Sequence, residues 1–206
     1  MLQLLAATTN KNKVREFLEI LDDLKEKVNI VTQDTIPGFP EIVEDGNTFE
    51  ENAMKKAKEA SAYADMAAMA DDSGLVVEAL GGAPGIHSAR YAGEGATDAD
   101  RIAKLLNAME GVTDRRAKFI CAAAIAYRGK EIGVFTGDIH GVITEKPSGS
   151  NGFGYDPVFI PDGFDKTFAE LSDDEKNAVS HRGRAMTALA AFLRNEFEQI
   201  DDFEFV

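Results

Sequence analysis

Apolar residues alternate along the chain between runs typical of buried strands and spacings typical of helices. The run at residues 2–8 predicts a short buried strand, and the alternating residues 28–32 predict a second strand. Between them, apolar side chains recur at helical spacing, at Val14, Phe17, Leu18, Leu21 and Leu24. A strand, a polar loop and a helix in this order are the opening of an α/β unit.

The next stretch predicts a long loop and a second helix. Residues 35–47 carry two prolines and two glycines, which favour a loop, and a loop of that length in a compact domain is often functional. Thr48 and Glu51 fit a capping box at the start of the helix. Its buried face is marked by Phe49, Ala53, Ala57, Ala60 and Ala64.

The second half of the chain predicts further sheet. A third helix covers residues 97–109. Strand-like runs follow at residues 118–128, 131–138 and 139–144, which indicate a mixed or antiparallel sheet. A glycine-rich loop bounded by prolines, residues 147–161, then leads into a short edge strand.

A last helix is expected at about residues 180–199, before an acidic end at residues 198–206 that we expect to be solvated. The whole pattern predicts an α/β fold in a single domain over residues 1–206. We expect an elongated mixed sheet flanked by helices, a layout that allows two lobes with a cleft between them.

The composition of the chain narrows the range of possible partners and functions. Lysine and arginine number 22 against 36 aspartates and glutamates, a net charge of −14, which opposes binding to nucleic acid but not to a small anion held by a few lysines. No apolar run reaches the ~18 residues of a membrane span, and no signal peptide is visible. We therefore expect a soluble cytoplasmic protein without a nucleic-acid or membrane partner. The lone Cys121 is expected to be a core residue.

One candidate phosphate site lies where the first strand meets the first helix. Backbone N–H groups, hydroxyls and two lysines gather there, and all can bind phosphate oxygens. The residues are Thr8, Thr9, Asn10, Lys11, Asn12 and Lys13. The glycines of a Walker loop are absent, so a polar turn with solvated lysines is the alternative. Lys56 shares a helix face with Phe49 and Asn52, where it is a further phosphate contact or a surface lysine.

Two adjacent aspartates, Asp71 and Asp72, follow a run of small apolar residues. Neighbouring carboxylates repel each other, so either the segment is a solvated turn or a cation lies on it. With Glu44 they form a platform for Mg²⁺, which takes oxygen ligands, and one aspartate could then be the general base for an attacking water. The alternative is a type I turn, which favours Asp, Ser and Gly.

A third group of residues offers donors and rings for a nucleobase. His181 and Arg182 form a pair of planar donors at a helix start, beside Lys176. Phe153 and Tyr155 offer rings for stacking.

Five segments of the chain resemble, in the same order, the motifs of the inosine triphosphate pyrophosphatase family. They are TTNKNK, EDGNTFEENAMKKA, ADDSGLVVEALGGAPGIHSARYAG, PSGSNGFGYDPVFIP and KNAVSHRGRA. The resemblance implies an elongated fold of two lobes with a central substrate cleft, a homodimer, and Mg²⁺-dependent cleavage of ITP, dITP and XTP to the monophosphate and pyrophosphate. Such cleavage cleanses the nucleotide pool of deaminated purines.

The resemblance also implies roles for individual residues. Asp72, Lys13 and Lys56 would be catalytic, and Glu44 and Asp72 would bind the metal. The substrate would contact Thr8, Thr9, Asn10, Lys11, Asn12, Lys13, Ser73, Phe153, Gly154, Tyr155, Asp156, Lys176, His181 and Arg182. Two alternatives stay open: a related house-cleaning pyrophosphatase that prefers pyrimidine nucleotides, and a nucleotide-sensing protein without turnover.

Overall fold

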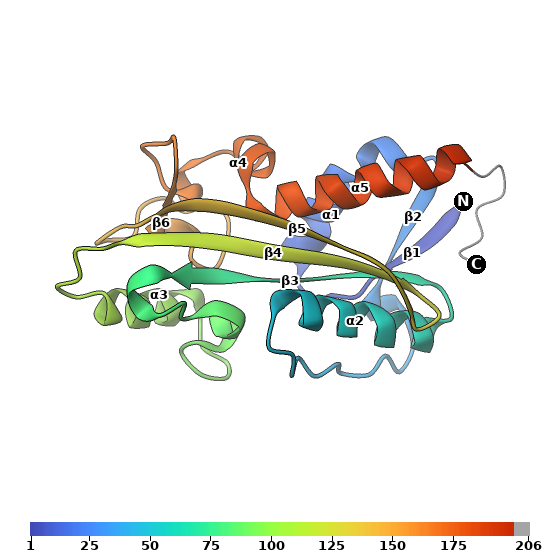
Figure 1. Cartoon of the computed structure of the whole chain (residues 1–206), viewed down its shortest axis with the longest axis horizontal. Helices are drawn as coiled ribbons and strands as arrows, with labels where there is room; N and C mark the ends of the chain where they lie inside the picture. The colour runs from blue at the N-terminus through green and yellow to red at the C-terminus, as the bar shows by residue number, and fades with distance from the viewer. Residues whose placement is uncertain (200–206) are drawn as a thin grey trace. The chain divides into compact units, whose positions relative to one another are not determined.

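The computed structural model describes residues 1–199, which contain one mixed sheet (Figure 1). Its strands are β1 (Leu2–Ala6), β2 (Val28–Thr32), β3 (Ala67–Val77), β4 (Arg116–Tyr127), β5 (Lys130–Ile143) and β6 (Phe159–Pro161). They lie in the order β2-β1-β3-β4-β5-β6. Strand β1 pairs parallel with β2 and β3, whereas β5 pairs antiparallel with β6. The predicted α/β fold with a mixed sheet is confirmed, while the acidic end beyond residue 199 lies outside the described residues.

The helices are α1 (Lys11–Ile20), α2 (Phe49–Ala64), α3 (Asp98–Ala108), α4 (Asp173–Val179) and α5 (His181–Gln199). Short 3₁₀ segments cover Asp22–Leu24, Gln33–Thr35, Glu78–Leu80, Gly85–Arg90, Asp156–Val158 and Phe168–Glu170. Side-chain caps begin three helices: the predicted cap Thr48 begins α2, Thr97 begins α3, and Asn10, which was not predicted as a cap, begins α1. Helix α4 was not predicted, because a helix of 7 residues gives little periodic signal.

Three local predictions need correction. The predicted capping box of Thr48 is only half formed, because the Glu51 carboxylate accepts the N–H of Asn47 instead. The runs at residues 131–138 and 139–144 belong to one strand, β5. Finally, Asp71 and Asp72 lie inside strand β3, so the type I turn is wrong.

The chain divides into two compact units, in line with the expected lobes. Unit 1 consists of Met1–Asp72, Cys121–Gly137 and Arg182–Val206, and unit 2 of Ser73–Ile120 and Asp138–His181. Each has its own core. Unit 1 buries Leu4, Phe17, Met69, Cys121, Ile125, Met186 and Leu189 among others. Unit 2 buries Leu75, Leu105, Phe119, Phe159 and Phe168 among others. The prediction that Cys121 is a core residue is confirmed.

Within unit 1, helices α2 and α5 lie on opposite sides of the strands (Figure 1). The alanines of α2 at positions 53, 57 and 60 are fully buried, which lets the helix pack close to the sheet. No helix among residues 1–199 is both long enough and apolar enough to cross a bilayer.

Candidate active site

The predicted phosphate loop joins β1 to α1 in unit 1, and its own side chains hold its shape. The Asn10 carboxamide accepts the N–H groups of Asn12 at 3.0 Å and Lys13 at 3.4 Å, and Thr8 Oγ1 accepts the N–H of Asn10 at 3.1 Å. Since these N–H groups already have partners, the side chains of the loop are better placed than its main chain to receive phosphate.

Lys13 connects this loop with the aspartate pair. Its Nζ lies 2.9 Å from Oδ2 of Asp71, whose side chain is fully buried in β3. The same oxygen lies 3.2 Å from Nε of Arg182, and the Arg182 guanidinium also donates to Glu16 at 2.6 Å. The cation expected on the aspartates is therefore, for Asp71, a pair of basic side chains. Burial favours a raised pKa for Asp71, but the charges of Lys13 and Arg182 outweigh it and lower the pKa below the usual range.

Asp72 has different neighbours. Its Oδ2 accepts a hydrogen bond from Nδ2 of Asn52 at 2.9 Å. Burial raises the pKa of Asp72, the charge of Glu44 adds to this effect, and Lys56 opposes it. The pKa values of the two adjacent carboxylates are thus shifted in opposite directions, so Asp72 binds a proton more readily than Asp71 does. A raised pKa suits a group that accepts a proton during a reaction.

Lys56 lies between the loop after β2 and strand β3. Its Nζ donates to Glu44 at 2.5 Å and to the main-chain oxygen of Asp71 at 2.6 Å. Although burial works against it, the charges of Asp71, Glu44 and Asp72 raise the pKa of Lys56, so the ammonium stays charged. The alternative of a solvated surface lysine is wrong.

The carboxylates of Glu44 and Asp72 fit a divalent cation. Positive charge beside Asp72 would be stabilising, because burial and the charge of Glu44 raise its pKa. Buried Oδ1 of Asp71 has no hydrogen-bond partner. Among residues 1–199 no three His, Cys, Asp or Glu side chains are grouped to hold a metal ion. A metal here would need further ligands from outside the protein, which is how Mg²⁺ commonly binds, through one or two carboxylates, substrate phosphates and waters.

The predicted base-binding segment, residues 153–156, belongs to unit 2. Oδ2 of Asp156 accepts the N–H of Phe153 and the ammonium of Lys176, both at 2.8 Å. The Lys176 ammonium also lies 4.8 Å from the centre of the partly exposed Phe153 ring. Asp156 therefore fixes both the loop and the lysine.

Two further contacts fix the segment of residues 153–156, one through Tyr155 and one through Gly154. Tyr155 is buried in the core of unit 2 and its hydroxyl donates to the main-chain oxygen of Ser88. The N–H of Gly154 donates to Asp98 at 2.7 Å. Phe153 is consequently the ring of this segment with an accessible face, and Tyr155 is an anchor for it.

The two residues of the predicted donor pair, His181 and Arg182, contact different units of the chain. The His181 ring stacks on Phe119 in unit 2, with centroids 4.7 Å apart and an interplanar angle of 10°. Arg182 instead binds Asp71 and Glu16 in unit 1. Two of the points where the chain passes between the units thus fall within predicted motifs, after Asp72 and after His181. Ser73, the first residue of unit 2, is partly exposed.

Sequence reasoning missed Glu16, Asp98 and a contact role for Asn52. Glu16 follows Lys13 by three positions and so shares its helix face, a signal that was available. Asp98 gave no local signal beyond its place in the first turn of α3, since its contact with Gly154 joins segments 56 residues apart.

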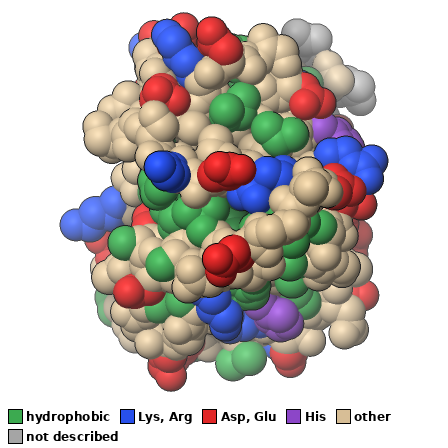
Figure 2. All heavy atoms as spheres, turned by 90° about the vertical axis from the view of Figure 1, so that its left-hand side faces the viewer, with side chains coloured by type: hydrophobic (Ala, Val, Ile, Leu, Met, Phe, Trp, Pro, Cys, Tyr) green, Lys and Arg blue, Asp and Glu red, His purple; other side chains and the backbone are tan. Residues whose placement is uncertain are grey.

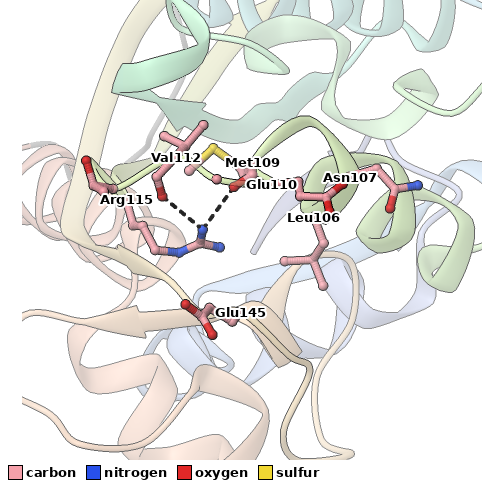
Figure 3. Close-up of a pocket in the computed structure, with 9 residues that line it drawn as sticks. Leu106, Asn107, Met109, Glu110, Val112, Arg115 and Glu145 are labelled. Atoms are coloured by element: carbon pink, nitrogen blue, oxygen red, sulfur yellow. Dashed lines mark hydrogen bonds between the residues drawn. The ribbon is translucent and has the colours of Figure 1, made fainter.

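Unit 2 also contains a hollow. Its volume is about 640 Å³, and its lining includes Leu106, Val112, Arg115 and Glu145 (Figure 3). The Arg115 guanidinium points to main-chain oxygens and donates to those of Ile143 at 2.6 Å and Thr144 at 2.7 Å. Because this cation is engaged by the main chain, the hollow is poorly suited to bind phosphate. None of the predicted site residues lines it.

The surface is not uniformly acidic despite the net charge of −14. Lys and Arg side chains lie among Asp and Glu side chains on the face shown in Figure 2. An anionic ligand can therefore approach parts of the molecule without facing a continuous negative surface.

Comparison with known proteins agrees with the motifs. A dITP/XTP pyrophosphatase of Geobacter sulfurreducens is 49% identical over 195 residues, covering 94% of this chain and 97% of that protein. One of Shouchella clausii is 48% identical over 191 residues, covering 92% and 95%. The structure of a HAM1 protein from Coxiella burnetii, 42% identical, superposes with a TM-score of 0.88 over 95% of this chain and 100% of that one. The model of the Ham1 family matches residues 4–192, and the chain therefore belongs to the Ham1 family.

Proposed function

We propose that this chain hydrolyses non-standard purine nucleoside triphosphates, dITP, XTP and ITP among them, to the monophosphate and pyrophosphate. The observation that carries the proposal is the environment of Asp72, a largely buried carboxylate with a raised pKa beside a partly buried lysine and a second carboxylate. A site that only binds a nucleotide needs no such proton acceptor. The relatives named dITP/XTP pyrophosphatases support the substrate class.

Unit 1 would bind the triphosphate. Lys13 and Lys56 both contact Asp71, Lys13 through its carboxylate and Lys56 through its main-chain oxygen, and carboxylates direct both ammonium groups. Positive charge placed in advance stabilises the negative charge that develops on the departing pyrophosphate. The polar side chains of Thr8, Thr9 and Asn10 would add hydrogen bonds, with Lys11, Asn12 and Ser73 as further contacts.

Glu44 and Asp72 would hold a Mg²⁺ ion. Bound there, the ion would supply positive charge to the phosphate oxygens and lower the pKa of a nearby water. The protein itself would supply the base: the Asp72 carboxylate takes the proton of the attacking water as that water adds to phosphorus and the bond to pyrophosphate breaks.

Unit 2 would select the base. A purine with an oxo group at position six accepts hydrogen bonds from Lys176 and His181, whereas adenine presents an amino donor at the same position. A buried polar group left without a partner costs about 1–3 kcal/mol, roughly a ten- to hundredfold difference in rate. The Phe153 ring would stack on the base, with Gly154, Tyr155 and Asp156 shaping the segment around it.

Arg182 would act on the base side indirectly. Its guanidinium donates to Glu16 and Asp71, and the residue before it in α5 is His181. By fixing the start of α5, Arg182 would set the position of the His181 ring.

We propose a homodimer in the cytoplasm, where the nucleotide pool is. Light scattering of the purified protein would measure the mass of the assembly.

The test is a substrate panel of ITP, dITP, XTP, ATP, GTP and UTP, with Mg²⁺ or with a chelator. We expect Mg²⁺-dependent pyrophosphate release from the first three, far above that from ATP and GTP. A preference for UTP would favour a pyrimidine-directed pyrophosphatase. Binding without any pyrophosphate would favour a nucleotide sensor.

A further inference from the structure

The side-chain amide of Asn52 connects the loop that carries Glu44 with the strand that carries Asp72. Its Oδ1 accepts the N–H of Gly46 at 2.8 Å, and its Nδ2 donates to Oδ2 of Asp72 at 2.9 Å. The orientation of the amide is fixed by chemistry, since a main-chain N–H can only donate and an ionised carboxylate can only accept. Asn52 is 1% exposed, so water does not compete for either bond.

The loop is shaped to reach this amide. A Cβ atom on Gly46 would lie 2.7 Å from Oδ1 of Asn52 and 2.8 Å from Cβ of Glu51. Only glycine leaves room for the main chain to come this close to helix α2. The contact between Gly46 and Asn52 is therefore a requirement of the local packing.

Lys56 makes a second bridge of the same kind, one helical turn further along α2. It joins Glu44 to the main-chain oxygen of Asp71, while Asn52 joins Gly46 to Asp72. The two side chains project from a helix whose alanines at positions 53, 57 and 60 are fully buried. Helix α2 thus acts as a rigid spacer between the loop and the strand.

We propose that Asn52 is a positioning residue for the reaction: it fixes the rotation of the Asp72 carboxylate and its separation from the loop of Glu44. This inference rests on the proposed function and deepens it. Because Oδ2 of Asp72 is held by the amide, the direction of Oδ1 is set as well. Reacting groups displaced by about 1 Å can lose about 100-fold in rate, so a loss of orientation alone is costly.

Asn52→Asp is the decisive variant. Aspartate has nearly the same shape and can still accept the N–H of Gly46, but it offers no donor to Asp72 and adds a like charge beside it. We expect kcat for dITP to fall about 100-fold, with KM changed by less than about threefold, because the interaction lost acts in the transition state rather than in substrate binding.

Glu51→Ala is the matched control. Glu51 Oε2 accepts the N–H of Asn47 at 2.6 Å, so this change releases the same loop one residue away without touching Asp72. If the loop contact alone mattered, Glu51→Ala would lower kcat and Asn52→Asp would not. We expect the opposite, with kcat of Glu51→Ala close to that of the unaltered protein.

A double-mutant cycle with Asp72→Asn tests whether Asn52 acts through Asp72. For it we use Asn52→Ala, which removes the amide, and measure residual turnover at high enzyme concentration together with thermal unfolding of each variant. The effect of Asn52→Ala should nearly vanish in the Asp72→Asn background.

Two results would overturn the inference: an unchanged kcat in folded Asn52→Asp, or an undiminished effect of Asn52→Ala once Asp72 is replaced. Failure of the proposed function is distinguishable, because the unaltered protein would then release no pyrophosphate from dITP, and the inference would fall with it. If Asn52→Ala proves too unstable to purify, Gly46→Ala replaces it in the cycle, since its added Cβ displaces the Asn52 amide.

Discussion

The pair of Glu16 and Arg182 offers a stability prediction that follows directly from the buried charges of unit 1. The two side chains are 6% and 2% exposed and lie 2.6 Å apart, and Asp71 lies 3.2 Å from the same guanidinium. Replacing Glu16 with glutamine removes one negative charge from this group while keeping the size of the side chain. The positive charge of Arg182 is then balanced by less negative charge, in a place where water does not screen it.

The magnitude can be worked from the geometry. Two charges about 4 Å apart attract by about 4 kcal/mol at an effective dielectric constant of about 20. Glutamine can still accept a hydrogen bond worth about 1 kcal/mol. The free energy of unfolding should therefore fall by about 3 kcal/mol, at the lower end of what is found when buried ion pairs are broken. For a chain of this length, that corresponds to a Tm lower by about 6–12 °C.

Urea unfolding followed by circular dichroism at neutral pH would measure the change. Asp114→Asn is the control, since Asp114 pairs with Arg116 at 2.7 Å on the surface and exposed pairs contribute little. We expect no measurable change for it. A loss below about 1 kcal/mol in Glu16→Gln would refute the reasoning, because the buried pair would then be worth no more than a typical surface pair.

The remaining predictions concern Asp72 and Lys176. Since the pKa of Asp72 is raised in the folded protein, its charge destabilises the fold at neutral pH and stability is regained as the pH falls below the folded-state pKa. Asp72→Asn should therefore raise Tm in the absence of Mg²⁺, while turnover falls by at least about 100-fold; a lower Tm would contradict this sign. Lys176→Met should lower the ratio of kcat/KM for ITP over ATP about ten- to hundredfold, measured against the exposed Lys166→Met as control. An unchanged ratio would remove Lys176 from the base site.

Much of the fold was predictable because it depends on local signals. Strand β2 has the predicted bounds, and the Thr97 cap forms the full capping box with Asp100. Strand β5 was predicted as two strands. Its Gly141 is required by packing, since a Cβ at this position would collide with the main chain of Ile160 in β6.

The aspartate pair shows where local reasoning fails. By propensity, the segment favours a turn, yet it is a buried part of β3. Lys13 and Arg182 supply the compensating charge for Asp71, and Arg182 is 111 residues away along the chain. Local propensity contains no information about such distant partners. The order of the motifs nevertheless marked this segment as part of a candidate site, because the resemblance extends over five segments of the chain rather than one.

The sequence named the residues of the candidate site but not how they are arranged. Lys13, Lys56 and Glu44 lie with the aspartates in unit 1, as the spacing and resemblance suggested. Arg182 does not share the surroundings of His181, although the two are adjacent, because successive residues of a helix point about 100° apart. Adjacency in sequence predicted one donor pair, whereas helix geometry directs the two side chains to different partners.

The most direct test of the central claim is to analyse the products of dITP hydrolysis by the unaltered protein and by Asp72→Asn, with saturating Mg²⁺. The assay must separate pyrophosphate from orthophosphate. We expect pyrophosphate and dIMP in equal amounts from the unaltered protein and a loss of turnover of at least about 100-fold in the variant. Orthophosphate as the product, or near-normal turnover in Asp72→Asn, would contradict it.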